Sequence, residues 1–125
     1  MTSGDVFELL HETLLIEAWQ HAKVGAVVFD DDRTYLTANQ AYLELVGYSR
    51  DEIGWLKAGA NLLVDEDGRL GYLRLINRHE RLHGSAPIRR KDGEVLMVDY
   101  FIVPTVVARL PYFIALMWPA ESGAR

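Results

Sequence analysis

The sequence predicts an α+β domain in which a five-stranded antiparallel sheet carries short helices on one face. Strand-length apolar runs occupy the two ends of the chain, and helical patterns lie between them. The strands are expected at residues 26–29, 35–38, 88–90, 95–103 and 112–118. The chain has 125 residues, of which 50% are hydrophobic and 25% charged, so it can bury a core as one globular domain.

The N-terminal segment is predicted to be a helix that flanks this domain. Its apolar residues, among them Val6, Leu10 and Leu14, recur at helical spacing through residues 5–22. No basic stretch followed by an apolar block opens the chain, so we expect no signal peptide and a cytoplasmic location. The expected organisation is a flanking or dimerisation helix over residues 1–22, a domain over residues 23–119 and a C-terminal tail over residues 120–125.

The stretch YLTANQAYLELVGYSRDEIG carries the signals that join the first strand pair, a hairpin, to the helices. Asn39 stands where the strand pattern ends, so its side chain can cap the first N–H groups of the following helix. Gly47 can close that helix in a left-handed conformation, after which Tyr48 can pack back onto the core. Ser49 then starts another short helix, with Glu52 at capping-box spacing. We expect these roles to be structural and not catalytic.

The second half of the chain contains one longer helix and the late strands. A turn over residues 65–68 is expected to precede a helix over residues 70–82. The sequence KDG at residues 91–93 predicts a hairpin turn. Pro104 is expected to end the strand that follows, because proline removes a hydrogen-bond donor from the ladder.

Both alternating sets of side chains in the last two strands are apolar, whereas an antiparallel sheet with one face in water alternates apolar and polar residues. We therefore expect the internal helices to cover one face. The other face requires the N-terminal helix, a second copy of the chain, or both. The surfaces expected to meet in a homodimer are Phe7, Leu10, Leu14 and Ala18 on the helix and Met97, Phe101, Phe113 and Met117 on the sheet.

Three segments together resemble the PAS domain, a fold of sensory and signalling modules: ANQAYLELVGYSRDEIG, IRRKDGEVLMVDYFIVPT and YFIALMWP. The resemblance covers about residues 22–119. It implies a five-stranded antiparallel sheet that cups a small apolar cavity against short helices. It also implies a signal relay and not an enzyme.

That resemblance places a pocket for a small apolar ligand between sheet and helices. The residues expected to line it are Leu62, Leu63, Tyr72, Ile76, Val98, Tyr100, Ile102, Leu116 and Trp118, with Trp55 closing it. An open cavity and a core filled by its own side chains produce the same sequence pattern, so both alternatives stay open.

The pattern HERLH at residues 79–83 is the feature that suggests an enzyme. In H-E-x-x-H, two histidines one helical turn apart hold zinc and the glutamate acts as a general base. A third ligand is not evident, and the glycine and proline that follow, Gly84 and Pro87, end the helix at once. His79 and His83 are therefore weak metal candidates, and a zinc hydrolase is an alternative that we do not expect. The serines fall at caps and turns without a paired histidine and carboxylate, so no catalytic residues are expected.

No cofactor is predicted. The chain has no cysteine, which excludes flavin–cysteinyl photochemistry. In PAS domains that bind haem the ligand is a histidine on the long internal helix, where this chain reads EDGRLGYLRL, so haem is not expected. Flavin held without a covalent bond stays open but has no support.

The charge distribution argues against nucleic acid as a partner, because the formal net charge is -5 and phosphate contacts need a basic face. No apolar run is long enough to span a membrane. Seven basic residues nevertheless gather in one region: Arg69, Arg74, Arg78, Arg81, Arg89, Arg90 and Lys91. They are interpreted as a solvated helix face and a hairpin tip, or alternatively as a docking patch for an acidic partner.

The function expected from these observations is a homodimeric PAS sensory module. It would relay the signal of a small ligand or a partner protein to an output domain on another chain or outside this sequence. The alternative is a protein–protein interaction module with a filled core and no ligand.

Overall fold

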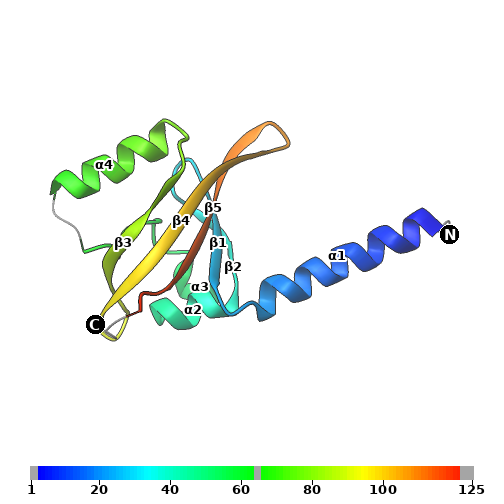
Figure 1. Ribbon diagram of the computed structural model, residues 1–125, viewed down its shortest axis with the longest axis horizontal. Helices are drawn as coiled ribbons and strands as arrows, with labels where there is room; N and C mark the ends of the chain where they lie inside the picture. The colour runs from blue at the N-terminus through cyan, green and yellow to red at the C-terminus, as the bar shows by residue number, and fades with distance from the viewer. Residues whose placement is uncertain (1–2, 64–65, 122–125) are drawn as a thin grey trace.

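The computed structural model describes residues 3–63 and 66–121, whose helices and strands follow the predicted order. The elements are α1 (Ser3–His21), β1 (Gly25–Asp30), β2 (Tyr35–Ala38), α2 (Gln40–Val46), α3 (Arg50–Ile53), α4 (Glu66–Asn77), β3 (Leu82–Arg89), β4 (Val95–Val107) and β5 (Leu110–Pro119) (Figure 1). The strands form one antiparallel sheet in the order β2-β1-β5-β4-β3. The predicted α+β fold class is confirmed.

The core lies between the inner face of this sheet and the short helices. Val27 and Phe29 of β1, Val98 of β4 and Phe113 of β5 are at most 2% exposed. The helix α2 adds four buried side chains to them, those of Tyr42, Leu43, Leu45 and Val46. An internal cavity can therefore lie only on the inner face of the sheet, where the short helices pack.

The predicted capping residues occupy their predicted roles. Asn39 has an extended backbone (φ -87°, ψ 171°), and its side chain accepts a hydrogen bond from the N–H of Tyr42, as an N-cap does. Gly47 ends α2 with a φ of 82°, a left-handed conformation that glycine adopts at little cost. Ser49 and Glu52 form the reciprocal capping box of α3.

The prediction for the longer helix was wrong at both ends. Residues 66–68, expected in a turn, are already helical, and the helix ends at Asn77 instead of residue 82. Leu82 is the first residue of β3, where it pairs with Ile102 of β4. A ladder running from Leu82 to Arg89 stabilises the strand against the local helical pattern. Of the side chains expected inside, Ile76 and Tyr72 are buried and Leu73 is partly buried, while the side chain of Leu70 lies outside the described part.

The prediction that Pro104 ends its strand was also wrong, because β4 continues to Val107. The pairing of β3 with β4 stops at Leu82 and Ile102, so beyond this point β4 pairs only with β5. A proline is tolerated where one edge of a strand needs no donor. The β4–β5 hairpin consequently extends beyond the other strands (Figure 1).

The two faces of β5 were assigned the wrong way round. Phe113 is fully buried on the inner face, where it stacks on Phe29 with ring centroids 5.3 Å apart. Met117 is partly buried on the same side, so neither residue belongs to the outer surface expected in a dimer. The outer positions of β5 are Ile114 and Leu116, which are 37% and 39% exposed. The two alternating sets of side chains along β5 are both apolar. A shift of one residue in register would bury the other set, so the sequence pattern could not show which set faces the core.

The outer face of the sheet and the helix α1 are both apolar and exposed. On β4 the outer positions include Met97 and Phe101, which are 49% and 36% exposed, respectively. Leu10 and Leu14 of α1 are 58% and 66% exposed, because the helix extends away from its own domain (Figure 1). Ala18 is exposed as well, while the side chain of Phe7 lies outside the described part. Only the last turns of α1 approach the sheet, where Leu15, Ile16 and Trp19 line a shallow hollow with Val28 and Thr37.

Candidate functional site

A small cavity lies between the inner face of the sheet and the helices. Its volume is about 30 Å³, and its walls are mostly apolar. The strands contribute Val27, Phe29, Tyr35, Tyr100, Ile102, Ala115 and Met117, and the helices and connecting segments contribute Tyr42, Ala58, Gly59, Asn61, Leu62 and Tyr72. The cavity lies between the sheet and the helices, which is where the resemblance to PAS domains implies a pocket.

Four tyrosines and Asn61 provide the polar side chains of this cavity. The hydroxyl groups of Tyr35 and Tyr42 lie 2.9 Å apart and share a hydrogen bond. Burial raises the pKa of Tyr42 well above its ordinary value, and the neighbouring Tyr35 raises it further. Burial also raises the pKa of Tyr35. Both phenols are thus neutral over the physiological range, and the pair offers a hydroxyl group and not a charge.

Gly59 lets the ring of Tyr72 close one side of the cavity. Its φ is 86°, and a Cβ at this position would lie 2.6 Å from the Cε2 atom of Tyr72. Such a distance is a clash, so only glycine allows α4 to bring this ring so close. Tyr72 and Ile76 are buried residues of α4, and they dock that helix over the cavity.

The size of the cavity limits what it can hold in this conformation. About 30 Å³ corresponds to two or three water molecules by the measure in which one water needs ~10–15 Å³. Pockets for drug-sized ligands and cofactors have volumes of roughly 300–1,000 Å³. Haem and flavin ring systems therefore do not fit the cavity as it stands.

Four of the ten residues expected at a ligand pocket line this cavity, namely Leu62, Tyr72, Tyr100 and Ile102. Ile76 and Val98 are buried in the core but do not line it. Leu116 and Trp118 were placed wrongly, since they lie on the outer face together with Phe101 and Asp99, their partners in β4. Leu63 lines a separate groove. Trp55 closes nothing, because 88% of its surface is exposed.

The lining residues that the sequence reasoning missed come largely from β1, β2 and α2. Val27 and Phe29 alternate along β1, and this alternation indicates a buried face. Tyr42 lies three residues after the N-cap Asn39, in the first turn of α2. The sequence contains these signals. Only the pairing of β1 with β5, however, shows that the β1 residues lie beside Ala115 and Met117.

The HERLH segment does not form a zinc site of the H-E-x-x-H type. The helix α4 ends at Asn77, and His79 lies in a turn with a φ of 54°. His83 belongs to β3 and packs against Phe101 on the outer face. His79 stacks instead on Phe113, with ring centroids 5.2 Å apart. The two histidines are therefore not one helical turn apart, and the metal candidates His79 and His83 are withdrawn.

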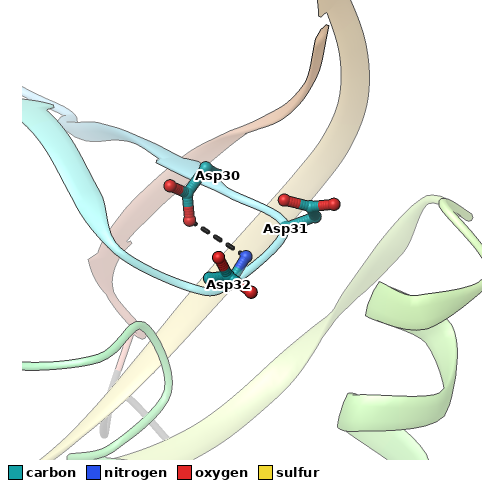
Figure 2. Close-up of side chains that lie close together, drawn as sticks. All are labelled: Asp30, Asp31 and Asp32. Carbon is teal, nitrogen blue, oxygen red and sulfur yellow. Dashed lines mark hydrogen bonds between the residues drawn. The ribbon is translucent and has the colours of Figure 1, made fainter.

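A cluster of three carboxylates lies on the turn between β1 and β2 (Figure 2). Among the described residues, Asp30, Asp31 and Asp32 are the group of side chains close enough together to hold a metal ion. Asp30 Oδ1 already accepts hydrogen bonds from the N–H groups of Asp32 and Thr34, at 3.0 and 2.9 Å. Asp31 and Asp32 are exposed. The arrangement is explained by the turn, which these hydrogen bonds close.

Among the described helices, none has the length and apolar character that crossing a membrane requires.

Comparison with known proteins finds similar folds. No protein-family model matches the sequence, and the search of curated proteins gave no match. The PAS domain of an HTR-like protein from Haloarcula marismortui superposes with a TM-score of 0.75 at 17% identity, covering 94% of this chain and 99% of that one. A domain of a sensory box sensor histidine kinase/response regulator from Geobacter sulfurreducens gives 0.71 at 21% identity, with coverages of 86% and 92%. The LOV domain of a blue-light activated histidine kinase from Erythrobacter litoralis gives 0.69 at 18% identity, with coverages of 79% and 97%. Likeness at such identities shows the fold and not the function.

Proposed function

Because the chain has the PAS fold, we propose that it is a sensory or signal-relay module and not an enzyme. The fold is shared with solved domains that are named as parts of sensor histidine kinases, which supports a signalling role. The relay would act through an output domain on another chain or outside this sequence. The cytoplasmic location and the division into residues 1–22, 23–119 and 120–125 stay predictions.

The observation that carries the proposal is the uncovered outer face of the sheet. Met97, Phe101, Ile114 and Leu116 are each between 36% and 49% exposed, and cross-strand pairing places Phe101 directly beside Leu116. Contiguous exposed apolar surface on a soluble domain marks an interaction site. A signal relay needs such a surface, because it must bias an interface that has two arrangements.

We assign this face to a homodimer in which α1 of one protomer covers the sheet of the other. The chain's own α1 extends away from the domain, so its exposed Leu10 and Leu14 lie away from the face that they could cover (Figure 1). A second copy supplies both missing surfaces at once, the apolar helix and the apolar sheet. Each buried leucine would then contribute roughly 1.5–3 kcal/mol from removal of its apolar surface from water.

The oligomeric state tests this proposal. We expect light scattering after size exclusion to give a dimer for the wild-type chain and a monomer for Leu116→Glu, because the change places a charge inside the interface. Trp55→Glu is the matched control: it also replaces an exposed hydrophobic residue, but it lies after α3, away from the outer face, and should stay dimeric. Removal of residues 1–19 should give a monomer or an aggregate. A soluble, folded dimer lacking α1, or a dimeric Leu116→Glu, would refute the assignment.

The incoming signal has two candidate sources. A small ligand would enter the tyrosine-lined cavity, whose hydroxyl pair supplies a polar anchor. The present volume of about 30 Å³ favours the second source, a partner protein bound by a module whose core is nearly filled. Native and denaturing mass spectrometry of the purified protein distinguish them. Extra mass that is lost on denaturation supports a ligand, and a bare dimer supports the interaction module.

A further inference from the structure

We propose that a groove beside the turn between β3 and β4 binds a small organic anion, a carboxylate or phosphate carried on an apolar body. The groove has a volume of about 290 Å³. Its lining includes the largely apolar side chains of Tyr48, Leu56 and Leu63, called here the apolar wall, and the basic residues Arg89, Arg90 and Lys91. It is separate from the tyrosine-lined cavity and from the outer face of the sheet, so this inference goes beyond the proposed relay function and does not depend on it.

The three basic side chains are not equally engaged within the protein. Lys91 is neutralised, because its Nζ forms an ion pair with Glu52. The Nη1 atom of Arg89 donates to the carbonyl oxygen of Gly93 at 3.1 Å. Arg90 differs from both, since its Nε is buried and has no hydrogen-bond partner. Among the described residues, it is the one buried side-chain nitrogen or oxygen in this condition.

Asp92 forms an ion pair with Arg90 but gives its Nε no hydrogen bond. The Oδ1 atom of Asp92 lies 3.8 Å from Nε, beyond hydrogen-bond distance. This oxygen accepts instead from the N–H of Glu94 at 2.9 Å, which holds Asp92 in the turn. A buried N–H group without a hydrogen-bond partner costs about 1–3 kcal/mol, so the Nε of Arg90 requires an explanation.

An anion in the groove provides that explanation. The guanidinium group is planar and donates in a fork that matches two oxygens of a carboxylate or phosphate. Arg90 is among the residues that line the groove, and its side chain is 31% exposed. Arg89 lines the same groove, and its guanidinium has N–H groups besides the one that donates to Gly93.

The apolar wall argues for an organic ligand and against a bare inorganic ion. Tyr48, Leu56 and Leu63 are half-buried, and they offer surface that only an apolar body can cover. The volume of about 290 Å³ is just below the range for small-molecule sites, roughly 300–1,000 Å³, so the ligand must be small.

Backbone hydrogen bonds hold residues 61–63, two of which line the groove, in place against β3. The N–H of Leu63 donates to the carbonyl oxygen of Pro87 at 2.8 Å, and the N–H of Arg89 donates to that of Asn61 at 2.9 Å. These two hydrogen bonds attach residues 61–63 to the edge of β3. Asn61 lines both the groove and the tyrosine-lined cavity, so the two spaces share this wall.

The experiment is a nuclear magnetic resonance titration of the full ¹⁵N-labelled chain with three probes. These are phenylacetate, phenyl phosphate and the neutral phenylacetamide, which has the shape of phenylacetate without its charge. We expect saturable shifts at the amides of residues 89–93 with at least one anion and none with phenylacetamide, and preference for one anion identifies the head group. Binding should weaken when the salt concentration is raised, because salt screens the exposed charges.

Substitutions locate the site. Arg90→Gln should weaken binding about tenfold or more, as expected for the loss of a hydrogen bond to a charged group. Arg81→Gln is the matched control: Arg81 is exposed and lies just before the opposite end of β3, so this change should leave binding unaltered. Equal binding of phenylacetamide, or an Arg90→Gln variant that binds like the wild type, would overturn the proposal.

Two further outcomes are informative. If inorganic phosphate binds as tightly as phenyl phosphate, the apolar wall has no role and the organic part of the proposal is wrong. If Arg90→Gln does not fold, the difference between phenylacetate and phenylacetamide on the wild-type chain decides whether the groove recognises an anion.

Discussion

Replacement of Asn39 by alanine should destabilise the domain more than a change at an ordinary helix start. Asn39 is fully buried, and its side chain forms hydrogen bonds with three backbone groups. Its Oδ1 accepts from the N–H of Tyr42 at 3.0 Å and from the N–H of Ala26 at 2.8 Å. Its Nδ2 donates to the carbonyl oxygen of Val24 at 3.0 Å. The residue is therefore an N-cap for α2 and also a tie between α2 and β1.

The magnitude follows from these contacts. Loss of an N-cap costs about 1 kcal/mol. The buried N–H of Ala26 loses its acceptor as well, which costs about 1–3 kcal/mol. The carbonyl of Val24 adds little, because this residue is exposed and water can replace the amide. We expect the free energy of unfolding of Asn39→Ala to fall by about 2–4 kcal/mol, or the midpoint by roughly 8–15 °C for a domain of this size.

Urea and thermal unfolding at one fixed protein concentration would measure this change. Asn39→Ser keeps a capping oxygen but is too short for both remaining contacts, so it should lie between Asn39→Ala and the wild type. Gln40→Ala is the matched control, an exposed neighbour that should change the free energy by at most about 0.5 kcal/mol. A cost below about 1 kcal/mol for Asn39→Ala, or unchanged hydrogen exchange at the N–H of Ala26, would refute the reasoning.

Two further predictions concern a glycine and a carboxylate. Gly59→Ala should destabilise the domain more than Gly93→Ala, because both have positive φ but only a Cβ at residue 59 meets the ring of Tyr72; unfolding curves that agree for the two variants would contradict this. A hydrogen bond from Lys91, followed by the N–H of Ser49, lowers the pKa of Glu52 from 4.5 to about 2. The folded pKa is the lower one, so the stability from this group is present above pH 4.5 and is lost as the pH falls towards 2. Carboxyl resonances followed through an acid titration should show the pKa of Glu52 rising towards its ordinary value in Lys91→Met, and no rise would argue against the pair.

Local signals in the sequence predicted the first half of the fold well. Asn39, Gly47 and Ser49 have their predicted conformations, because a cap is decided by its own backbone and by neighbours a few residues away. The end of α4 was not predictable in this way. Leu82 joins β3 through its pairing with Ile102, and this partner lies far along the chain.

The candidate site was predicted only in part, for two physical reasons. The alternation in β5 leaves the buried set undecided when both sets are apolar, so Leu116 was assigned to the cavity and Phe113 to the surface. Burial of a large apolar residue also depends on what lies above it, which is why Trp55 was misplaced. The unpartnered nitrogen of Arg90 is a non-local property as well, since the turn sequence alone does not show that Asp92 bonds to Glu94 instead.

The strand order has a consequence for how the chain folds during synthesis. The central strand of the sheet is β5, which pairs with β1 on one side, and Gly25 near the start of the domain pairs with Met117 near its end. The β1–β2 hairpin therefore has no neighbour on its inner side until β5 has left the ribosome. A sheet closed by its last strand has a high contact order, so folding should be slow compared with that of helical domains of similar size. Nascent chains halted before residue 110 should remain sensitive to protease, and those that include β5 and reach beyond the exit tunnel should become resistant in one step.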